Sequence, residues 1–171
     1  MGLMLLLGGA RSGKSALAVR TAEEWGGPVT FVATGAAGDE EMAARIERHR
    51  AERPAAWTTV EEPTDLVNAL RSTPADALVV IDCLSLWVSN LVEAGWEDAA
   101  IEAEASAAAA LAAEREAPTV TVSNEVGLGI VPATPLGRRY RDLLGRVNAI
   151  FAAEADDPIL VVAGKKLRLE A

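Results

Sequence analysis

One stretch near the beginning of the chain has the residue types and spacing of a phosphate-binding loop. It fits the pattern G-x-x-x-x-G-K-[ST] at every fixed position, with the residues Gly8, Gly9, Ala10, Arg11, Ser12, Gly13, Lys14 and Ser15. Backbone N–H groups in such a loop can hold a phosphate, the lysine can reach the β- and γ-phosphates, and the Ser15 hydroxyl can ligate Mg²⁺. We therefore expect the chain to bind a nucleoside triphosphate.

A carboxylate ends the most apolar run in the middle of the chain. Asp82 directly follows Val79, Val80 and Ile81. In a phosphate-loop fold, a carboxylate at the end of a buried strand is the expected second anchor for Mg²⁺, although Asp82 could also cap the helix after it. We expect Ser15 and Asp82 to hold the metal ion together. The only cysteine, Cys83, is the residue directly after Asp82, and it is predicted to be buried and unreactive.

The only histidine of the chain, His49, stands among arginines. Arg45 and Arg53 lie four residues to either side, and Arg48 and Arg50 are adjacent. Nearby positive charge lowers the pKa of an imidazole and favours its neutral, nucleophilic form. The same arginines could hold a polyphosphate, so His49 could attack a nucleotide phosphate. Taken alone, a single histidine on a helix is more often structural or exposed, and that alternative stays open at this point.

These residues need a framework, and the hydrophobic pattern predicts alternating strands and helices. Predicted strands occupy residues 3–7, 29–33, 57–61, 77–82, 119–123 and 159–163, and predicted helices occupy residues 15–25, 39–51, 64–71, 84–94, 98–115 and 135–155. The helix at 98–115 is rich in alanine and is expected on an outer face. The order predicts an α/β fold of the P-loop NTPase type (RecA-like): a doubly wound, mostly parallel sheet, with residues 166–169 as an antiparallel edge strand.

Ligands of such sheets bind at the carboxyl ends of the strands. This rule brings Thr34, Asp82, Asn124 and Glu125 close to the phosphate loop, because each ends or follows a predicted strand. Asn124 and Glu125 could line a substrate site or could simply form a turn. A second group of arginines, at positions 138, 139, 141 and 146, could be a solvated helix face or could contact phosphate.

Composition limits the possible classes of protein. With 171 residues, half of them hydrophobic, the chain is expected to form one domain over residues 1–171. The net charge of −9 argues against nucleic acid as a partner. No secretory signal is visible and no apolar run is long enough for a membrane span. A single cysteine excludes an intramolecular disulfide, and we expect a cytoplasmic location.

Several blocks together resemble the family of bifunctional adenosylcobinamide kinases/adenosylcobinamide-phosphate guanylyltransferases. They comprise the loop at 8–15, Ala33-Thr34, the R-I-x-x-H-R block at 45–50, Arg53-Pro54, Trp57, Glu61, the run at 82–91, the S-N-E-V-G-x-G-I-V-P block at 123–132 and residues 145–148. The loop alone is common to many folds, whereas the two lettered blocks together are specific. The similarity covers nearly the whole chain.

The resemblance implies two reactions in cobalamin biosynthesis, with GTP and ATP as substrates and Mg²⁺ as cofactor. A nucleoside triphosphate phosphorylates the hydroxyl of adenosylcobinamide. His49 then attacks GTP, carries GMP and transfers it to adenosylcobinamide phosphate, giving adenosylcobinamide-GDP. Lys14 and His49 are the implied catalytic residues, and the nucleotide contacts are the eight loop residues with Thr34, Gly35, Arg50, Arg53, Glu61 and Asp82. The family also implies a homo-oligomer, a trimer.

Other readings of the same residues remain possible. Glu61 could contact the nucleotide, act as a base or be a surface carboxylate. A P-loop small-molecule kinase would use the loop without guanylyl transfer. A GTP-dependent switch or binding protein would need a guanine-reading N-K-x-D motif, which is missing, and the D-x-x-G match at 142–145 falls in a predicted helix. A DNA-acting ATPase is disfavoured by the acidic balance.

Overall fold

The computed structural model describes residues 2–36, 50 and 53–170. Apart from Arg50, the predicted helix at 39–51, with Arg45, Arg48 and His49, therefore lies outside the described residues. Within them, seven strands form one sheet in the order β3-β2-β4-β5-β1-β6-β7. They are β1 (Leu3–Leu7), β2 (Val29–Ala33), β3 (Thr58–Glu61), β4 (Leu78–Asp82), β5 (Thr119–Val122), β6 (Asp157–Val162) and β7 (Lys165–Arg168).

The pairing of the strands follows the predicted pattern. Every pair is parallel except β6 and β7, which are antiparallel. The prediction of a mostly parallel sheet with an antiparallel edge strand is confirmed. Strands β1, β2 and β5 are buried along their whole length, because helices cover both faces of the sheet. Strand β1 is accordingly a continuous apolar run, whereas β5 alternates threonine with valine and buries all four residues.

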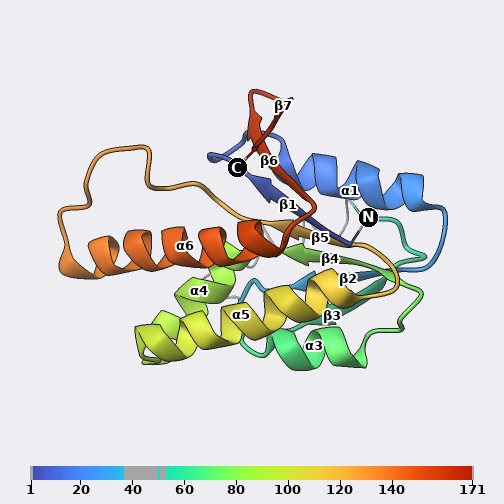
Figure 1. The fold of residues 1–171 in the computed structure, drawn as a ribbon, viewed down its shortest axis with the longest axis horizontal. Helices are drawn as coiled ribbons and strands as arrows, with labels where there is room; N and C mark the ends of the chain where they lie inside the picture. The colour runs from blue at the N-terminus through green and yellow to red at the C-terminus, as the bar shows by residue number, and fades with distance from the viewer. Residues whose placement is uncertain (1, 37–49, 51–52, 171) are drawn as a thin grey trace.

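Helices cover the two faces of the sheet unequally (Figure 1). One face carries α1 (Lys14–Trp25), and the other carries α3 (Leu66–Ser72), α4 (Leu84–Glu93), α5 (Asp98–Glu114) and α6 (Pro135–Glu154). Local sequence sets the helix starts: the side chain of Asp65 accepts a hydrogen bond from the Asn68 N–H, and Thr134 caps α6 just before Pro135. None of the helices described here combines the length and apolar composition needed to cross a bilayer.

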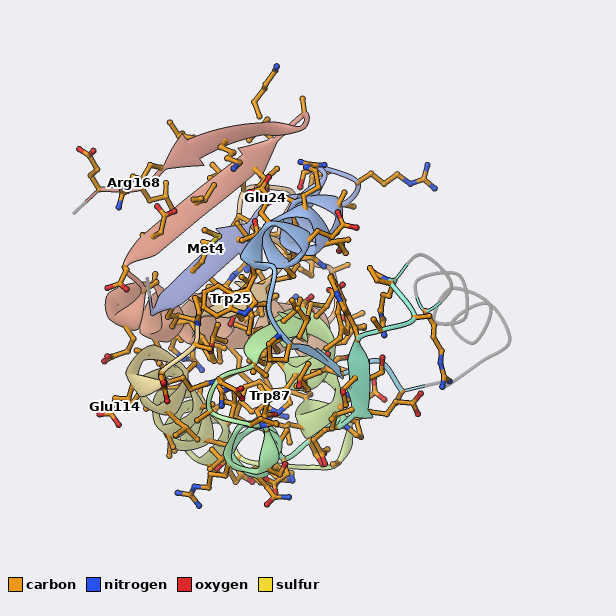
Figure 2. All side chains as sticks on the ribbon, turned by 90° about the vertical axis from the view of Figure 1, so that its right-hand side faces the viewer. Met4, Glu24, Trp25, Trp87, Glu114 and Arg168 are labelled. Carbon is orange, nitrogen blue, oxygen red and sulfur yellow. The ribbon has the colours of Figure 1, made fainter. Side chains whose placement is uncertain are left out.

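The sheet separates two apolar cores. On the α1 side, Leu17 and Ala22 pack with Met4 and other residues of the central strands. On the other side, Trp87 is fully buried among the helices, and its indole N–H donates to the carbonyl oxygen of Thr64 at 2.7 Å. Figure 2 shows Met4 and Trp87 on opposite sides of the sheet. The two cores hold the strand ends rigidly from both faces.

Helix α5 differs from its prediction. It does not merely lie on an outer face, because one of its sides is completely buried between α3 and α6. The buried residues are Ile101, Ala105, Ala108, Ala109 and Ala112. Alanine side chains allow neighbouring elements to approach closely, so a helix with few large apolar residues can still belong to the core.

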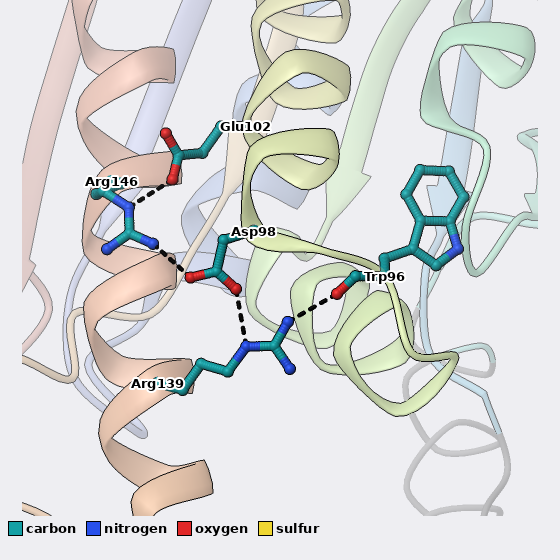
Figure 3. A network of polar contacts seen from close by, with 5 residues as sticks. All are labelled: Trp96, Asp98, Glu102, Arg139 and Arg146. Carbon is teal, nitrogen blue, oxygen red and sulfur yellow. Dashed lines mark hydrogen bonds and ion pairs between the residues drawn. The ribbon is translucent and has the colours of Figure 1, made fainter.

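A polar network joins α5 to α6 at the surface (Figure 3). The Asp98 carboxylate accepts hydrogen bonds from Arg139 Nε and Arg146 Nη2, both at 2.8 Å, and Arg146 Nε donates to Glu102 at 2.6 Å. Arg139 also donates to the carbonyl oxygen of Trp96 at 2.7 Å. These two arginines therefore hold helices together, and the alternative that they contact phosphate is not supported.

This network predicts a pH-dependent contribution to stability. The hydrogen bond from Arg139, together with Arg146 and both positive charges, holds the pKa of Asp98 below its usual range. A depressed pKa stabilises the folded state above the unfolded pKa of about 3.9, and the contribution is lost as pH falls through the folded pKa. Asp98→Asn should lower the free energy of unfolding by about 0.5–1 kcal/mol at pH 7, because the pair is partly exposed.

The difference between Asp98→Asn and the parent should shrink as pH falls below about 4, because the unfolded state then binds a proton that the folded carboxylate resists. Urea unfolding at pH 7 and pH 3 measures it. The exposed Asp76 offers a matched control in Asp76→Asn, for which we expect little change at either pH. An equal loss for Asp98→Asn at both pH values would contradict the role of this charge.

Strand β5 carries two buried threonines whose hydroxyls have no hydrogen-bond partner among the described residues, Thr119 and Thr121. A buried hydroxyl without a partner costs free energy that a methyl group does not. Thr121→Val should therefore raise the free energy of unfolding by about 1 kcal/mol, measured by denaturant titration. Thr58→Val, at an exposed position of β3, is the control and should be nearly neutral. Destabilisation by Thr121→Val would contradict the unpaired hydroxyl.

Candidate active site

A cavity of about 510 Å³ opens at the carboxyl ends of the central strands. Residues 10–15 of the phosphate loop line one side of it. The other walls come from strand ends and the segments beyond them, and they include Gly35, Arg53, Glu61, Asp82 and Asn124. The rule for parallel sheets thus accounts for residues from the ends of five strands, β1 to β5, in one cavity.

The phosphate loop joins β1 to α1 in a tight, well-supported turn. Gly13 has a φ of 101°, which favours glycine, and its carbonyl oxygen accepts the first hydrogen bond of α1, from Leu17 N at 3.0 Å. The buried Lys14 folds back, and its Nζ donates to the carbonyl oxygen of Gly9 at 2.7 Å. The backbone carbonyl of Ser12 accepts from Gly164 N, in the β6–β7 turn, at 2.9 Å.

Gly8 is required for space. A Cβ at this position would clash with the carbonyl oxygen of Val161, and φ is +154°. No side chain fits there without moving the backbone of β6. The loop therefore leaves β1 in close contact with β6, which explains why the first glycine of the motif stands directly after the strand.

Two oxygen donors suited to a divalent cation share the cavity. Ser15, at the start of α1, and Asp82, at the end of β4, both line it. The described residues contain no group of three or more His, Cys, Asp and Glu side chains able to hold a metal ion. A hydroxyl and a carboxylate fit the way Mg²⁺ is bound beside nucleotides, where waters and phosphate oxygens supply the remaining ligands.

Arg53 brings a positive charge to the cavity wall, and Arg50 lies nearby in the chain. The Arg53 guanidinium lies over the ring of Phe31, 3.6 Å from its centroid. Burial lowers the pKa of Arg53, while the nearby Asp82 carboxylate works against that shift. Arg50 forms an ion pair with Glu61, with Nη1 and Oε1 3.5 Å apart and both side chains largely exposed. Arg53 was expected from the sequence, whereas the platform that Phe31 provides was not.

Thr34 requires a correction. It was expected to contact the nucleotide, yet it is fully buried and does not line the cavity. Its hydroxyl donates to the carbonyl oxygen of Cys83 at 2.7 Å and accepts from Cys83 N at 2.8 Å. Thr34 lies behind the cavity wall because strand β2 ends beside β4. Gly35, the next residue, does reach the cavity.

The loop after β5 divides into two parts. Asn124 lines the cavity, and its Nδ2 donates to Ser85 Oγ at 3.1 Å. Asn148 of α6 donates to the carbonyl oxygen of Asn124 at 3.1 Å. Glu125 instead accepts a hydrogen bond from Gly127 N, so its carboxylate stabilises a turn. The supporting roles of Ser85 and Asn148 were not predicted from the sequence. The signal that the sequence offers for such a role is a polar residue on the buried face of a predicted helix.

Cys83 is half-buried, rather than buried as expected, and it lines the cavity beside Asp82. Its thiol lies 2.9 Å from Ser85 Oγ. Burial, with a further contribution from the Asp82 carboxylate, raises the pKa of Cys83 to about 11. The thiol therefore stays protonated near neutral pH, in agreement with the prediction of an unreactive cysteine.

A glycine-rich loop between strand and helix, a strand-end carboxylate in the same cavity and a mostly parallel sheet define a nucleotide-binding protein of the P-loop NTPase type. The family model described as "Cobinamide kinase / cobinamide phosphate guanyltransferase" matches residues 4–169. The chain belongs to this family, and the resemblance drawn from its sequence is confirmed.

Curated relatives match over almost the full chain. The "Bifunctional adenosylcobalamin biosynthesis protein CobP" of Pseudomonas aeruginosa is 43% identical over 167 residues, which cover 97% of this chain and 96% of that protein. The "Bifunctional adenosylcobalamin biosynthesis protein CobU" is 39% identical over 184 residues in Escherichia coli and over 185 residues in Salmonella typhimurium, covering 98% of this chain and 99% of each relative.

Proposed function

We propose that this chain phosphorylates adenosylcobinamide with a nucleoside triphosphate and then transfers GMP from GTP to the product, giving adenosylcobinamide-GDP. The observation that carries the proposal is the meeting of the phosphate loop, Asp82 and Arg53 in one cavity, in a chain whose residues 4–169 match the kinase and guanyltransferase family. In this proposal, a single domain over residues 1–171 catalyses both reactions.

In the kinase reaction, the hydroxyl oxygen of the acceptor forms a bond to the γ-phosphorus while the bond between that phosphorus and the β–γ bridging oxygen breaks. The nucleoside diphosphate leaves, and the hydroxyl proton passes to a base or to water. Loop N–H groups and Lys14 bind the phosphates, and Arg53, which lines the same cavity, offsets their charge. Ser15 and Asp82 would hold Mg²⁺, which supplies further charge neutralisation on the phosphates when bound.

In the guanylyl transfer, a ring nitrogen of His49 forms a bond to the α-phosphorus of GTP, and pyrophosphate leaves. A phosphate oxygen of adenosylcobinamide phosphate then attacks the same phosphorus, and the phosphorus–nitrogen bond breaks. His49 is proposed from the sequence. Its chain neighbour Arg50 pairs with Glu61, which lines the cavity, and this supports a role for the segment at the same site.

The test is a product analysis. The pure protein is incubated with Mg²⁺, GTP and adenosylcobinamide. The corrinoid products are then separated and identified by mass spectrometry. We expect adenosylcobinamide phosphate, then adenosylcobinamide-GDP with release of pyrophosphate. Accumulation of the phosphate alone would favour a small-molecule kinase, and slow GTP hydrolysis without either product would favour a switch protein.

The proposal also includes the setting of the enzyme. A homo-oligomer, a trimer as the family resemblance implies, is supported by the exposed apolar side chains of Leu128, Ile130, Val131 and Leu136. A cytoplasmic location accords with the free thiol of Cys83. Nucleic acid is not proposed as a partner, since the net charge is −9.

A further inference from the structure

The backbone just beyond β4 is held by one side chain from the end of β2. Thr34 uses both hydrogen-bonding functions of its hydroxyl on the same residue: it donates to Cys83 O at 2.7 Å and accepts from Cys83 N at 2.8 Å. Its backbone N–H donates to Asp82 O at 3.2 Å. The two peptide groups that flank Cys83 are therefore both fixed to Thr34.

Thr34 is itself held from the helical layer. The Asn90 Nδ2 group of α4 donates to Thr34 O at 2.8 Å and to Pro63 O at 3.0 Å. One side-chain amide thus ties the end of β2 to the segment that follows β3. The chain of contacts runs from Asn90 to Thr34 and from Thr34 to the residues that end β4.

We call the hydrogen bonds that Asn90 makes to Thr34, and Thr34 to Cys83, the clamp. Its position relative to the cavity indicates its role. Asp82 lines the cavity, whereas Thr34 is fully buried behind it. Beyond the end of a sheet ladder, backbone N–H and C=O groups lose their strand partners and need others. The Thr34 hydroxyl supplies both partners for Cys83, so the main chain carrying the Asp82 carboxylate has one defined orientation.

We propose that Thr34 and Asn90 are positioning residues that fix the Asp82 carboxylate for binding the magnesium–nucleotide complex, without touching the substrates themselves. The inference rests on the proposed function of Asp82. Groups that orient a metal ligand commonly change metal affinity or activity about 10- to 100-fold when removed. We expect a change of this size for loss of the Thr34 hydroxyl.

The decisive comparison is Thr34→Val, which removes the hydroxyl while keeping the shape, against Thr34→Ser, which keeps it. GTP affinity is measured by calorimetry with Mg²⁺ and with EDTA. Thr34→Val should weaken GTP binding about 10- to 100-fold with Mg²⁺ and leave it unchanged in EDTA, while Thr34→Ser should restore the Mg²⁺ effect. Thr73→Val is the matched control, since Thr73 is buried, donates to Ala69 O at 2.8 Å and does not line the cavity.

The outcomes separate the inference from the proposed function. A folded Thr34→Val protein with the parent's Mg²⁺ dependence would overturn the inference, as would a parent whose GTP affinity is the same with Mg²⁺ and EDTA. Failure of the parent to phosphorylate the corrinoid would refute the proposed function alone, because the binding comparison needs no acceptor. Should Thr34→Val not fold, Asn90→Ala tests the same clamp, and an unchanged Mg²⁺ effect there overturns it.

Discussion

A His49→Asn variant is expected to phosphorylate adenosylcobinamide at close to the parent rate and to form no adenosylcobinamide-GDP. Asparagine has a similar reach but no nucleophilic ring nitrogen, so the covalent route is closed while the phosphate loop is untouched. Loss of a catalytic nucleophile lowers rates by more than about 1,000-fold. The measurement uses GTP labelled at the α-phosphate and denatured protein.

The parent should carry a label that survives base and is lost in acid, as a phosphorus–nitrogen bond requires, and the variant should carry none. Phosphorylation of adenosylcobinamide, assayed in the same preparation, controls for folding. Label on the variant would assign the nucleophile elsewhere. An unlabelled parent that still binds GTP would leave a kinase or a switch as the function.

A Lys14→Met variant is expected to lose kinase activity by about 100- to 1,000-fold, the range seen when one charge-stabilising donor is removed from an active site. Lys14 is buried in the loop, and its Nζ lies 2.7 Å from Gly9 O, so it is positioned before a nucleotide arrives. Methionine keeps the apolar stem and removes the charge. The ratio kcat/KM for phosphorylation of adenosylcobinamide measures the loss.

Lys165→Met provides the control, because Lys165 is an exposed lysine of β7. It should leave kcat/KM near the parent value. Thermal unfolding of both variants shows whether the fold is intact. If the Lys14→Met protein folds and keeps the parent's kinase rate, Lys14 is not a catalytic residue.

The features predicted well from the sequence are those that depend on neighbouring residues. The run before Asp82 forms a buried strand because it is apolar throughout, and the phosphate loop forms where glycines stand between a strand and a helix. The shared cavity of Ser15, Asp82 and Asn124 then follows from parallel-strand geometry, whereas Arg53, which precedes β3, was expected from the family resemblance. The role of His49 stays a prediction.

The features missed depend on contacts between distant segments. Thr34 was expected at the ligand, but its neighbour across the sheet takes up its hydroxyl. From the sequence, Arg139 and Arg146 could have contacted phosphate. In the structure both arginines donate hydrogen bonds to Asp98, which lies more than 40 residues away in sequence. The buried side of α5 also depends on its neighbours, because alanine carries little periodic signal.

The contact between the phosphate loop and the β6–β7 turn bears on how the protein matures during synthesis. The loop leaves the ribosome early, but β1 pairs with β6, and Gly164 N binds Ser12 O. Pairing between segments so far apart in sequence forms slowly. A nascent chain that ends before β6 therefore lacks the strand and the turn that support its nucleotide loop, so we expect competence to bind a nucleotide only after these late strands have been made.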